Sequence, residues 1–266
     1  MKHNWEQIDT YAKQWVKEAG ALIKKSFSKE LLIKFKSNPN DLVTNMDQEV
    51  EQFLIEKIRL TFPSHRILGE EGFGEELESN EGVVWVIDPI DGTMNFIHQQ
   101  RNFAISVGIY ENGVGRIGLI YDVVHDELYH AFKGKGAFMN DIQLPKLEPV
   151  EVKEAVIGLN STWVTPNKRI DHEVLTPLVR HVRGTRSYGS AAIEMAYVAS
   201  GRLDAYITLR LAPWDFAGGK ILVEEVGGTA TSLEGEPLSI LTKSSVLIAK
   251  PGLHTSILND YVKRGE

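Results

Sequence analysis

The most informative stretch for the fold is VVWVIDPIDGT, residues 83–93. Its first five residues, 83–87, predict a β-strand that is apolar on both faces, as in a strand buried in the middle of a layered sheet. This strand runs directly into Asp88, and Asp91 follows with a proline fixing the backbone between them. We expect a turn there that points both carboxylates and the Ile90 carbonyl toward one point.

Gly92 and Thr93 complete this run. Gly92 has no Cβ, so a phosphate could approach the backbone closely there. Thr93 supplies a hydroxyl, and a helix beginning at these two residues would offer free N–H groups to a phosphate. Taken alone, such a run is more often a polar turn whose aspartates accept backbone hydrogen bonds. A functional role for this run therefore depends on further carboxylates elsewhere in the chain.

The residues before this stretch predict two helices. Apolar residues at helical spacing indicate an amphipathic helix over residues 8–23. A short strand over residues 31–35 and a turn at residues 38–40 come next. Thr44 and Asp47 then form a capping-box-like start for the second helix.

The residues after this stretch predict mixed strands and helices. Strands are expected at residues 103–109, 114–121 and 127–132. The second half alternates, with strands at 155–159, 203–208 and 245–248, and helices at 170–182, 191–200, 214–226 and the C-terminus. The pattern predicts a single layered α/β domain over residues 1–266, with a possible sub-domain seam near 145–150.

Composition excludes several classes of protein. The chain has 266 residues, of which 42% are apolar and 24% charged, as in ordinary globular domains. No apolar run approaches the roughly 18 residues of a membrane span, and residues 1–6 do not resemble a signal peptide. Cysteine is absent, which excludes thiolate metal sites and cysteine nucleophiles and fits a cytoplasmic location. With a net charge of −7 and no basic run longer than two residues, a nucleic-acid polymer is not the expected partner.

Four carboxylates follow predicted strands or lie in loops, where a rigid sheet can direct them: Glu70, Asp88, Asp91 and Asp215. Carboxylate oxygens without cysteine suit a hard ion such as Mg²⁺ or Mn²⁺. A bound cation would also let so acidic a protein accept an anionic substrate. Each residue has a simpler alternative, because Asp215 and Asp47 could only cap helices and Glu70 could be a solvated loop charge. Their combination in one chain favours a metal site.

Four segments carry a family resemblance. Residues 88–96 (DPIDGTMNF), and residues 214–219 (WDFAGG) with the glycines at 227–228, are similar to two signatures of the inositol monophosphatase family. Residues 69–71 (GEE) and 41–47 (DLVTNMD) match further family segments in the same order. The resemblance implies an αβαβα sandwich of the inositol monophosphatase and fructose-1,6-bisphosphatase superfamily, and a Mg²⁺-dependent phosphatase.

The resemblance also implies residue roles. The ligands implied for a first Mg²⁺, which also holds the attacking water, are Glu70, Asp88, the Ile90 carbonyl and Thr93. Those implied for a second, on the leaving-group side, are Asp88, Asp91 and Asp215. A third, weaker ion near Glu70, replacement by Mn²⁺ and inhibition by Li⁺ are further family traits.

By the same resemblance, Asp47 pairs with the Thr93 hydroxyl, so that Thr93 and Glu70 orient and deprotonate the water. The Gly92 and Thr93 backbone N–H groups bind the phosphate. Two-metal chemistry of this kind requires positioning and charge stabilisation, and no nucleophilic side chain.

The remaining resemblance concerns the leaving alcohol. Gly189, Ser190 and Ala191 match a family segment that contacts it, although small residues there would also permit tight helix packing. Asp91 and Asp215 are expected to contact substrate as well. Trp163 is predicted to be a packing residue.

One departure leaves the substrate open. Animal members carry a glutamate seven residues before the aspartate of the second signature, and Thr208 occupies that position here. Arg210, nearby, would favour a second anionic group or else be a solvated charge. The leading prediction is an inositol monophosphatase that acts on myo-inositol 1-phosphate. The alternative activities are those of a fructose-1,6-bisphosphatase, a 3′(2′),5′-bisphosphate nucleotidase and an NADP phosphatase. A non-catalytic metal-binding regulatory protein is the different-class alternative, and a homodimer is the expected assembly.

Overall fold

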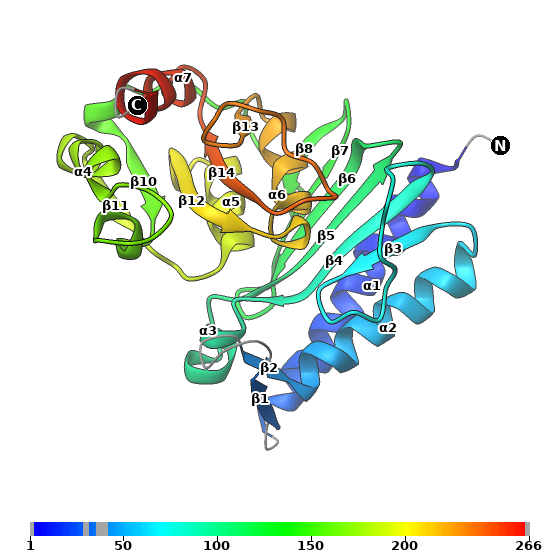
Figure 1. Cartoon of the computed structure of the whole chain (residues 1–266). Coiled ribbons are helices and arrows are strands. Elements are labelled where there is room, and N and C mark those ends of the chain that lie inside the picture. The colour runs from blue at the N-terminus through cyan, green and yellow to red at the C-terminus, as the bar shows by residue number, and fades with distance from the viewer. Residues whose placement is uncertain (1–2, 29–31, 36–41, 264–266) are drawn as a thin grey trace.

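The computed structural model describes residues 3–28, 32–35 and 42–263. Helices and two β-sheets alternate in five layers (Figure 1). The αβαβα sandwich expected from the family resemblance is confirmed. The turn predicted at residues 38–40 lies outside the described residues.

The first layer consists of α1 (Trp5–Ser26) and α2 (Asn45–Thr61). Both helices bury the apolar face predicted from the sequence against the first sheet, around the fully buried Trp85. Thr44 and Asp47 form the predicted capping box of α2. Beside α2, β1 (Ile33–Phe35) pairs with β2 (Leu42–Thr44), which confirms the described part of the predicted strand.

The second layer is a sheet of seven strands within the described residues, in the order β3 to β9. Their bounds are Arg66–Gly69, Val83–Asp91, Ala104–Glu111, Val114–Asp122, Glu127–Phe132, Gly136–Met139 and Ile142–Gln143. Every residue of β4 is buried, as its apolar sequence predicted. The strands β3, β8 and β9 were not predicted, because two to four residues give no periodicity and only pairing with a neighbour defines them.

The third layer contains α5 (Ala191–Ala199) and α6 (Pro213–Glu225), which pack between the two sheets. Two glycines of the first sheet allow the close approach of α6. A Cβ on Gly108 would lie 2.7 Å from the backbone of Ala217, and one on Gly118 would lie 2.4 Å from the Gly218 carbonyl oxygen. Contact between backbones therefore fixes α6, and with it Asp215, relative to the first sheet.

The fourth layer is a second sheet with strand order β11-β10-β12-β14-β13. The bounds of β10 to β14 are Val156–Leu159, Gly184–Arg186, Ala205–Leu211, Thr229–Thr231 and Ser244–Ala249. The outer layer holds α4 (His172–His181), α7 (Leu253–Ile257) and a π-helical turn (Leu258–Val262), packed on the far face of this sheet. The short helical turns Val152–Glu154 and Ser161–Val164 lie between these elements.

Residues 145–149 lie in the segment that connects the two sheets. The single domain over residues 1–266, with a sub-domain seam near 145–150, stays a prediction. Within the part of the chain that the structure describes, no helix has both the length and the apolar character that a membrane span requires.

Candidate active site

The two aspartates of the opening stretch lie in one strand. The predicted turn after Asp88 is wrong, because β4 continues to Asp91. Along β4, Asp88 pairs with Ser106 and Asp91 with Ala104, so β4 contains one residue more than β5 over this interval. Residues three apart in a regular strand face opposite sides, and such a bulge brings them to the same side. Bulge geometry, rather than a turn, thus explains how both carboxylates reach one point.

Asp215 joins them from the first turn of α6. One carboxylate oxygen from each of Asp88, Asp91 and Asp215 lies within 4.8 Å of the others. Asp215 also accepts a hydrogen bond from the Ala212 N–H at 2.7 Å, from the third helical position. The residue therefore combines the capping role considered from the sequence with a place in the acidic cluster.

Glu70 lies beside Asp88 because β3 is parallel to β4. Gly69 pairs with Ile87, and the Glu70 N–H donates to the Ile87 carbonyl at 3.2 Å. The carboxyl ends of two parallel neighbours meet at the same sheet edge. The structure thus brings the loop after β3 to the acidic cluster, as the sequence predicted.

Glu51 supports that loop and was not predicted. Its fully buried carboxylate accepts hydrogen bonds from the Glu71 N–H at 2.7 Å and the Phe73 N–H at 3.0 Å. A Cβ on Gly69 would lie 2.5 Å from this carboxylate, so a larger residue there would displace Glu51 from its present position. Its sequence signal was its place four residues after Asp47, which puts both acids on the buried face of α2.

Thr93 begins the short helix α3 (Thr93–Gln99) and contacts Asp47. Thr93 Oγ1 lies 3.1 Å from Asp47 Oδ1 and 3.1 Å from the Ile90 carbonyl oxygen. The other Asp47 oxygen accepts from the Thr44 N–H at 2.8 Å and the Thr44 hydroxyl at 2.6 Å. Asp47 therefore caps α2 and holds Thr93 at the same time.

Gly92, directly before α3, has a backbone conformation and a setting that both require glycine. Its φ is +92°, and a Cβ would lie 3.2 Å from the Asn102 carbonyl oxygen and 3.2 Å from Ser190 Cβ. The side-chain amide of Asn95 donates to the carbonyls of Asn102 at 2.8 Å and Tyr188 at 2.7 Å. These contacts join α3 to the segment before α5. This role of Asn95 was not predicted from the sequence.

The segment before α5 holds Asp91. The Ser190 hydroxyl donates to Asp91 Oδ2, and the Ala192 N–H donates to the same oxygen at 2.8 Å. The Ser190 side chain is therefore engaged with Asp91. Contact of this segment with a leaving alcohol stays a prediction.

A cavity of about 250 Å³ opens beside Asp91 and Asp215. Its lining includes the predicted residues Asp91, Gly189, Ser190, Ala191, Thr208 and Asp215. The residues not predicted are Asn160, Trp163, Ser187, Glu194, Tyr206, Ile207 and Leu211. Trp163 packs against the apolar core of the second sheet, as predicted, and also lines the cavity.

Three other predicted substrate contacts are placed differently. Gly92 and Thr93 lie at the start of α3 and do not line this cavity. Arg210 is exposed on β12 and is also outside the lining. Its contact with a substrate stays a prediction.

Glu194 is a second buried acid of this cavity beside Asp91, and 3% of its surface is exposed. One oxygen accepts from the Tyr188 N–H at 2.8 Å and the Gly189 N–H at 3.3 Å. Burial raises the pKa of Glu194 to about 7, with a smaller contribution from the charge of Asp91. A single glutamate within the otherwise apolar helix of residues 191–199 was the overlooked signal.

The acidic cluster is suited to a hard cation. Burial and then the neighbouring carboxylates, Glu70 among them, hold the pKa of Asp88 and of Asp215 well above the ordinary range. Burial also raises the pKa of Asp91 to about 6. Asp88 Oδ2 is buried without a hydrogen-bond partner among the described residues. Buried anionic oxygens without compensating positive charge are costly, and a divalent cation with oxygen ligands removes this cost.

A pH dependence of stability follows from these pKa values. Asp91 and Glu194 keep their protons up to about pH 6 and about pH 7 in the folded state, whereas the unfolded chain releases them near pH 4. The folded state therefore binds more protons in this window, and without Mg²⁺ its stability should fall as pH rises from about 4 to 7. Mg²⁺ requires the ionised forms, so saturating Mg²⁺ should raise Tm by about 5–10 °C at pH 8 and much less at pH 5. Calorimetry with and without Mg²⁺ checks this, and an equal gain at both pH values would contradict it.

This chain is similar to known proteins over nearly its whole length. The inositol monophosphatase family model matches residues 4–266. An inositol-1-monophosphatase of Bacillus subtilis (strain 168) is 62% identical over 97% of this chain and 98% of its own length.

Two solved structures are similar over nearly the whole chain. SaIMPase-II with bound inositol monophosphate is 43% identical, with a TM-score of 0.87 over 97% of this chain and 94% of that one. An IMPase/NADP phosphatase complexed with Mg²⁺ and phosphate is 26% identical, with a TM-score of 0.88 over 96% and 95%. This chain belongs to the inositol monophosphatase family.

Proposed function

We propose that this chain is a Mg²⁺-dependent phosphomonoesterase whose preferred substrate is myo-inositol 1-phosphate. The observation that carries the proposal is the convergence of Asp88, Asp91 and Asp215 within 4.8 Å, beside a cavity of about 250 Å³. The 62% identical relative named inositol-1-monophosphatase supports the reaction and the substrate class.

The proposed metal ligands come from the loop after β3, from β4, from the start of α3 and from the first turn of α6. They are Glu70, Asp88, the Ile90 carbonyl, Thr93, Asp91 and Asp215, with Asp88 shared between two ions and a third ion near Glu70. The acidic cluster and the relative complexed with Mg²⁺ and phosphate support a divalent cation here, and the family resemblance supports two to three ions with Mn²⁺ as a substitute. When bound, the ions supply positive charge that favours deprotonation of water and neutralises the leaving oxygen.

Thr93 and Asp47 are proposed to orient the attacking water. When the Thr93 hydroxyl donates to Asp47, 3.1 Å away, its oxygen can accept a hydrogen bond from the water and take a proton from it as the hydroxyl proton passes to Asp47. Glu70 is the proposed general base beside Thr93. Hydrogen bonds to the Ile87 carbonyl and to Glu51 fix the loop that contains Glu70, and a general base must be held in position. The backbone N–H groups of Gly92 and Thr93 are the proposed phosphate contacts.

The substrate pocket favours a neutral polyol over a second anion. Thr208 is buried in the cavity wall and offers a hydroxyl, whereas the exposed Arg210 lies outside the lining. Glu194 and Asp91 add acidic character near the cavity, which disfavours a second phosphate. These observations support inositol 1-phosphate over fructose 1,6-bisphosphate, 3′-phosphoadenosine 5′-phosphate and NADP.

The test is phosphate release from these four substrates with and without Mg²⁺. The highest kcat/KM is expected with inositol 1-phosphate, and removal of Mg²⁺ by EDTA should abolish activity on every substrate. A higher kcat/KM with a bisphosphate would overturn the substrate assignment while leaving the reaction intact. Complete inactivity with Mg²⁺ present would support the non-catalytic alternative.

The family resemblance supports four further proposals. The chain acts as a homodimer, works in the cytoplasm, is inhibited by Li⁺ at the second metal site, and folds as one catalytic domain over residues 1–266. Sedimentation analysis and Li⁺ inhibition curves test the first and third.

A further inference from the structure

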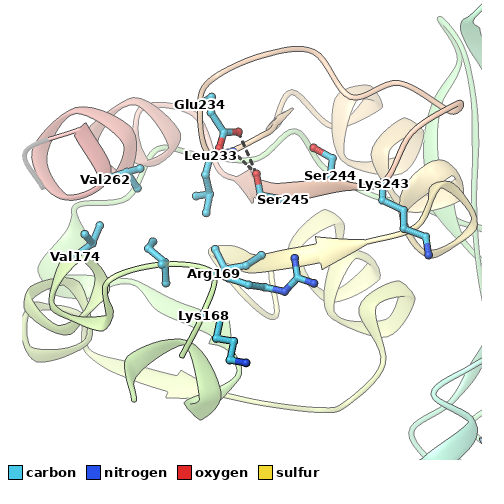
Figure 2. Close-up of a pocket in the computed structure, with 11 residues that line it drawn as sticks. Lys168, Arg169, Val174, Leu233, Glu234, Lys243, Ser244, Ser245 and Val262 are labelled. Carbon is cyan, nitrogen blue, oxygen red and sulfur yellow. Dashed lines mark hydrogen bonds between the residues drawn. The ribbon is translucent and has the colours of Figure 1, made fainter. Parts of the chain in front are cut away.

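A second cavity, of about 640 Å³, lies on the second sheet (Figure 2). It is lined by Lys168, Arg169, Ile170, Val174, Leu209, Leu233, Glu234, Lys243, Ser244, Ser245 and Val262. Among the described residues it shares no lining residue with the cavity beside Asp91. The proposed function therefore leaves this cavity unexplained.

Three cations gather at this cavity in a chain whose net charge is −7. Lys168, Arg169 and Lys243 are exposed, and none of them has an ion-pair partner among the residues that the structure describes. In contrast, Lys250, at the other end of β14, lies 2.7 Å from Asp204. The field around the second cavity is therefore locally positive, which favours anions.

The single carboxylate of the lining does not neutralise these cations. Glu234 accepts a hydrogen bond from the Ser245 hydroxyl at 3.2 Å, on the edge of the cavity formed by the segment before β14. Hydrogen bonds, first of all from Ser232, lower the pKa of Glu234, so it is ionised and held at that edge. The charge of Lys243 also acts on Asp215, which lies outside this lining, and no described carboxylate forms an ion pair with Lys168, Arg169 or Lys243. All three side chains therefore remain able to contact a ligand.

The apolar and cationic groups occupy different ends of the cavity. Figure 2 shows Val174 and Val262 at one end, while the Arg169 guanidinium and the Lys243 ammonium extend toward the other. Leu209 and Leu233, both buried in the core of the second sheet, form part of the apolar surface. A ligand that fits this arrangement has an apolar body and one anionic group.

We infer that this cavity binds a small organic anion, in which a phosphate or sulfonate group is joined to an apolar or aromatic body. The anionic group lies between Arg169 and Lys243, where guanidinium and ammonium donors form charge-assisted hydrogen bonds. The apolar body lies against Ile170, Val174 and Val262. A volume of about 640 Å³ is in the range of small-molecule sites.

The site is close to the catalytic cavity without being part of it. Leu211 lines the catalytic cavity and pairs in register with Ser244, which lines the second one. Along β12, Thr208 contributes to the first cavity and Leu209 to the second. Both cavities thus lie against the same end of the β12–β14 pair.

The test is a fluorescence titration with 8-anilinonaphthalene-1-sulfonate, which has an aromatic body and one sulfonate. Arg169→Gln/Lys243→Gln should bind this probe about tenfold more weakly, equivalent to about 1.4 kcal/mol, because both charge-assisted contacts are lost. The matched control is Arg180→Gln/Lys25→Gln, which removes two exposed cations elsewhere that form no ion pair with any described residue, and it should leave the affinity unchanged. Ser244→Trp, which fills this cavity alone, should abolish binding while the thermal unfolding transition is retained.

Three results would overturn the inference. The first is an unchanged affinity in Arg169→Gln/Lys243→Gln. The second is an equal loss of probe affinity in Arg180→Gln/Lys25→Gln, since binding would then depend only on the overall charge of the protein. The third is a change of oligomeric state in Arg169→Gln/Lys243→Gln by sedimentation, since the cavity would then belong to a subunit interface.

Discussion

Asp88→Asn is expected to lower kcat by about a thousandfold or more at saturating Mg²⁺. Asp88 is the proposed ligand shared by two ions, and its Oδ2 has no hydrogen-bond partner in the described protein. Loss of Lewis-acid charge at this point removes several kcal/mol of transition-state stabilisation, and about 4 kcal/mol corresponds to a thousandfold in rate. The measurement is kcat for inositol 1-phosphate over a range of Mg²⁺ concentrations.

The same substitution should not destabilise the metal-free protein. The introduced asparagine can still accept the hydrogen bond that the Ile90 N–H now donates to Asp88 Oδ1 at 3.0 Å. The change also replaces a buried carboxyl group, whose ionisation beside Glu70, Asp91 and Asp215 is costly, with a neutral one, so Tm without Mg²⁺ should be unchanged or higher. The stabilisation by Mg²⁺ at pH 8 should largely disappear.

The control for Asp88→Asn is Asp122→Asn. Asp122 is equally buried, with 1% of its surface exposed, and accepts from the His125 N–H at 3.1 Å, outside the acidic cluster. This variant should keep kcat within about threefold of the parent enzyme. If Asp88→Asn kept its activity and its Mg²⁺ response, the metal-site assignment would be refuted.

Thr93→Val is expected to lower kcat by about a hundredfold to ten-thousandfold with little change in KM. Valine has nearly the shape of threonine but lacks the hydroxyl that lies 3.1 Å from Asp47 Oδ1 and is proposed to relay the proton of water to Asp47. Positioned proton transfer contributes rate factors of about this size. Steady-state kinetics with inositol 1-phosphate separate kcat from KM.

Thr93→Ser provides the matched rescue. It restores the hydroxyl beside Asp47 without the methyl group, and kcat should return to within about tenfold of the parent. A merely structural role for Thr93 would instead lower Tm in Thr93→Val and leave kcat per folded molecule intact. Near-normal kcat in Thr93→Val would exclude Thr93 from the chemistry.

Much of the candidate site could be predicted because its residues follow strands or open helices. The apolar run before Asp88 predicted β4, and the Thr44 capping box predicted α2 together with the position of Asp47. What failed was the local geometry, since the expected turn after Asp88 is a bulge within β4. A bulge depends on how many residues the partner strand places opposite, and this count belongs to the pair and not to either strand.

The supporting residues were harder to predict. Glu51, Asn95 and Glu194 each bond backbone groups of segments distant in sequence or of the loop before α5. A lone polar residue on a helix gives no indication of which loop it will meet. Trp163 packs against the core of the second sheet as predicted, but only the folded chain also places it at the cavity wall.

The sequence by itself determined the class of chemistry. Carboxylates at strand ends, no cysteine and a glycine before a helix start are local properties, and they indicate an oxygen-ligated cation and a phosphate. The position of Asp215, 124 residues after Asp91, depends on the tertiary structure. The folded chain brings a carboxylate oxygen of Asp215 within 4.8 Å of those of Asp88 and Asp91. The physical reason is backbone contact, since the glycines of β5 and β6 let α6 approach the sheet closely enough for its first turn to meet the end of β4.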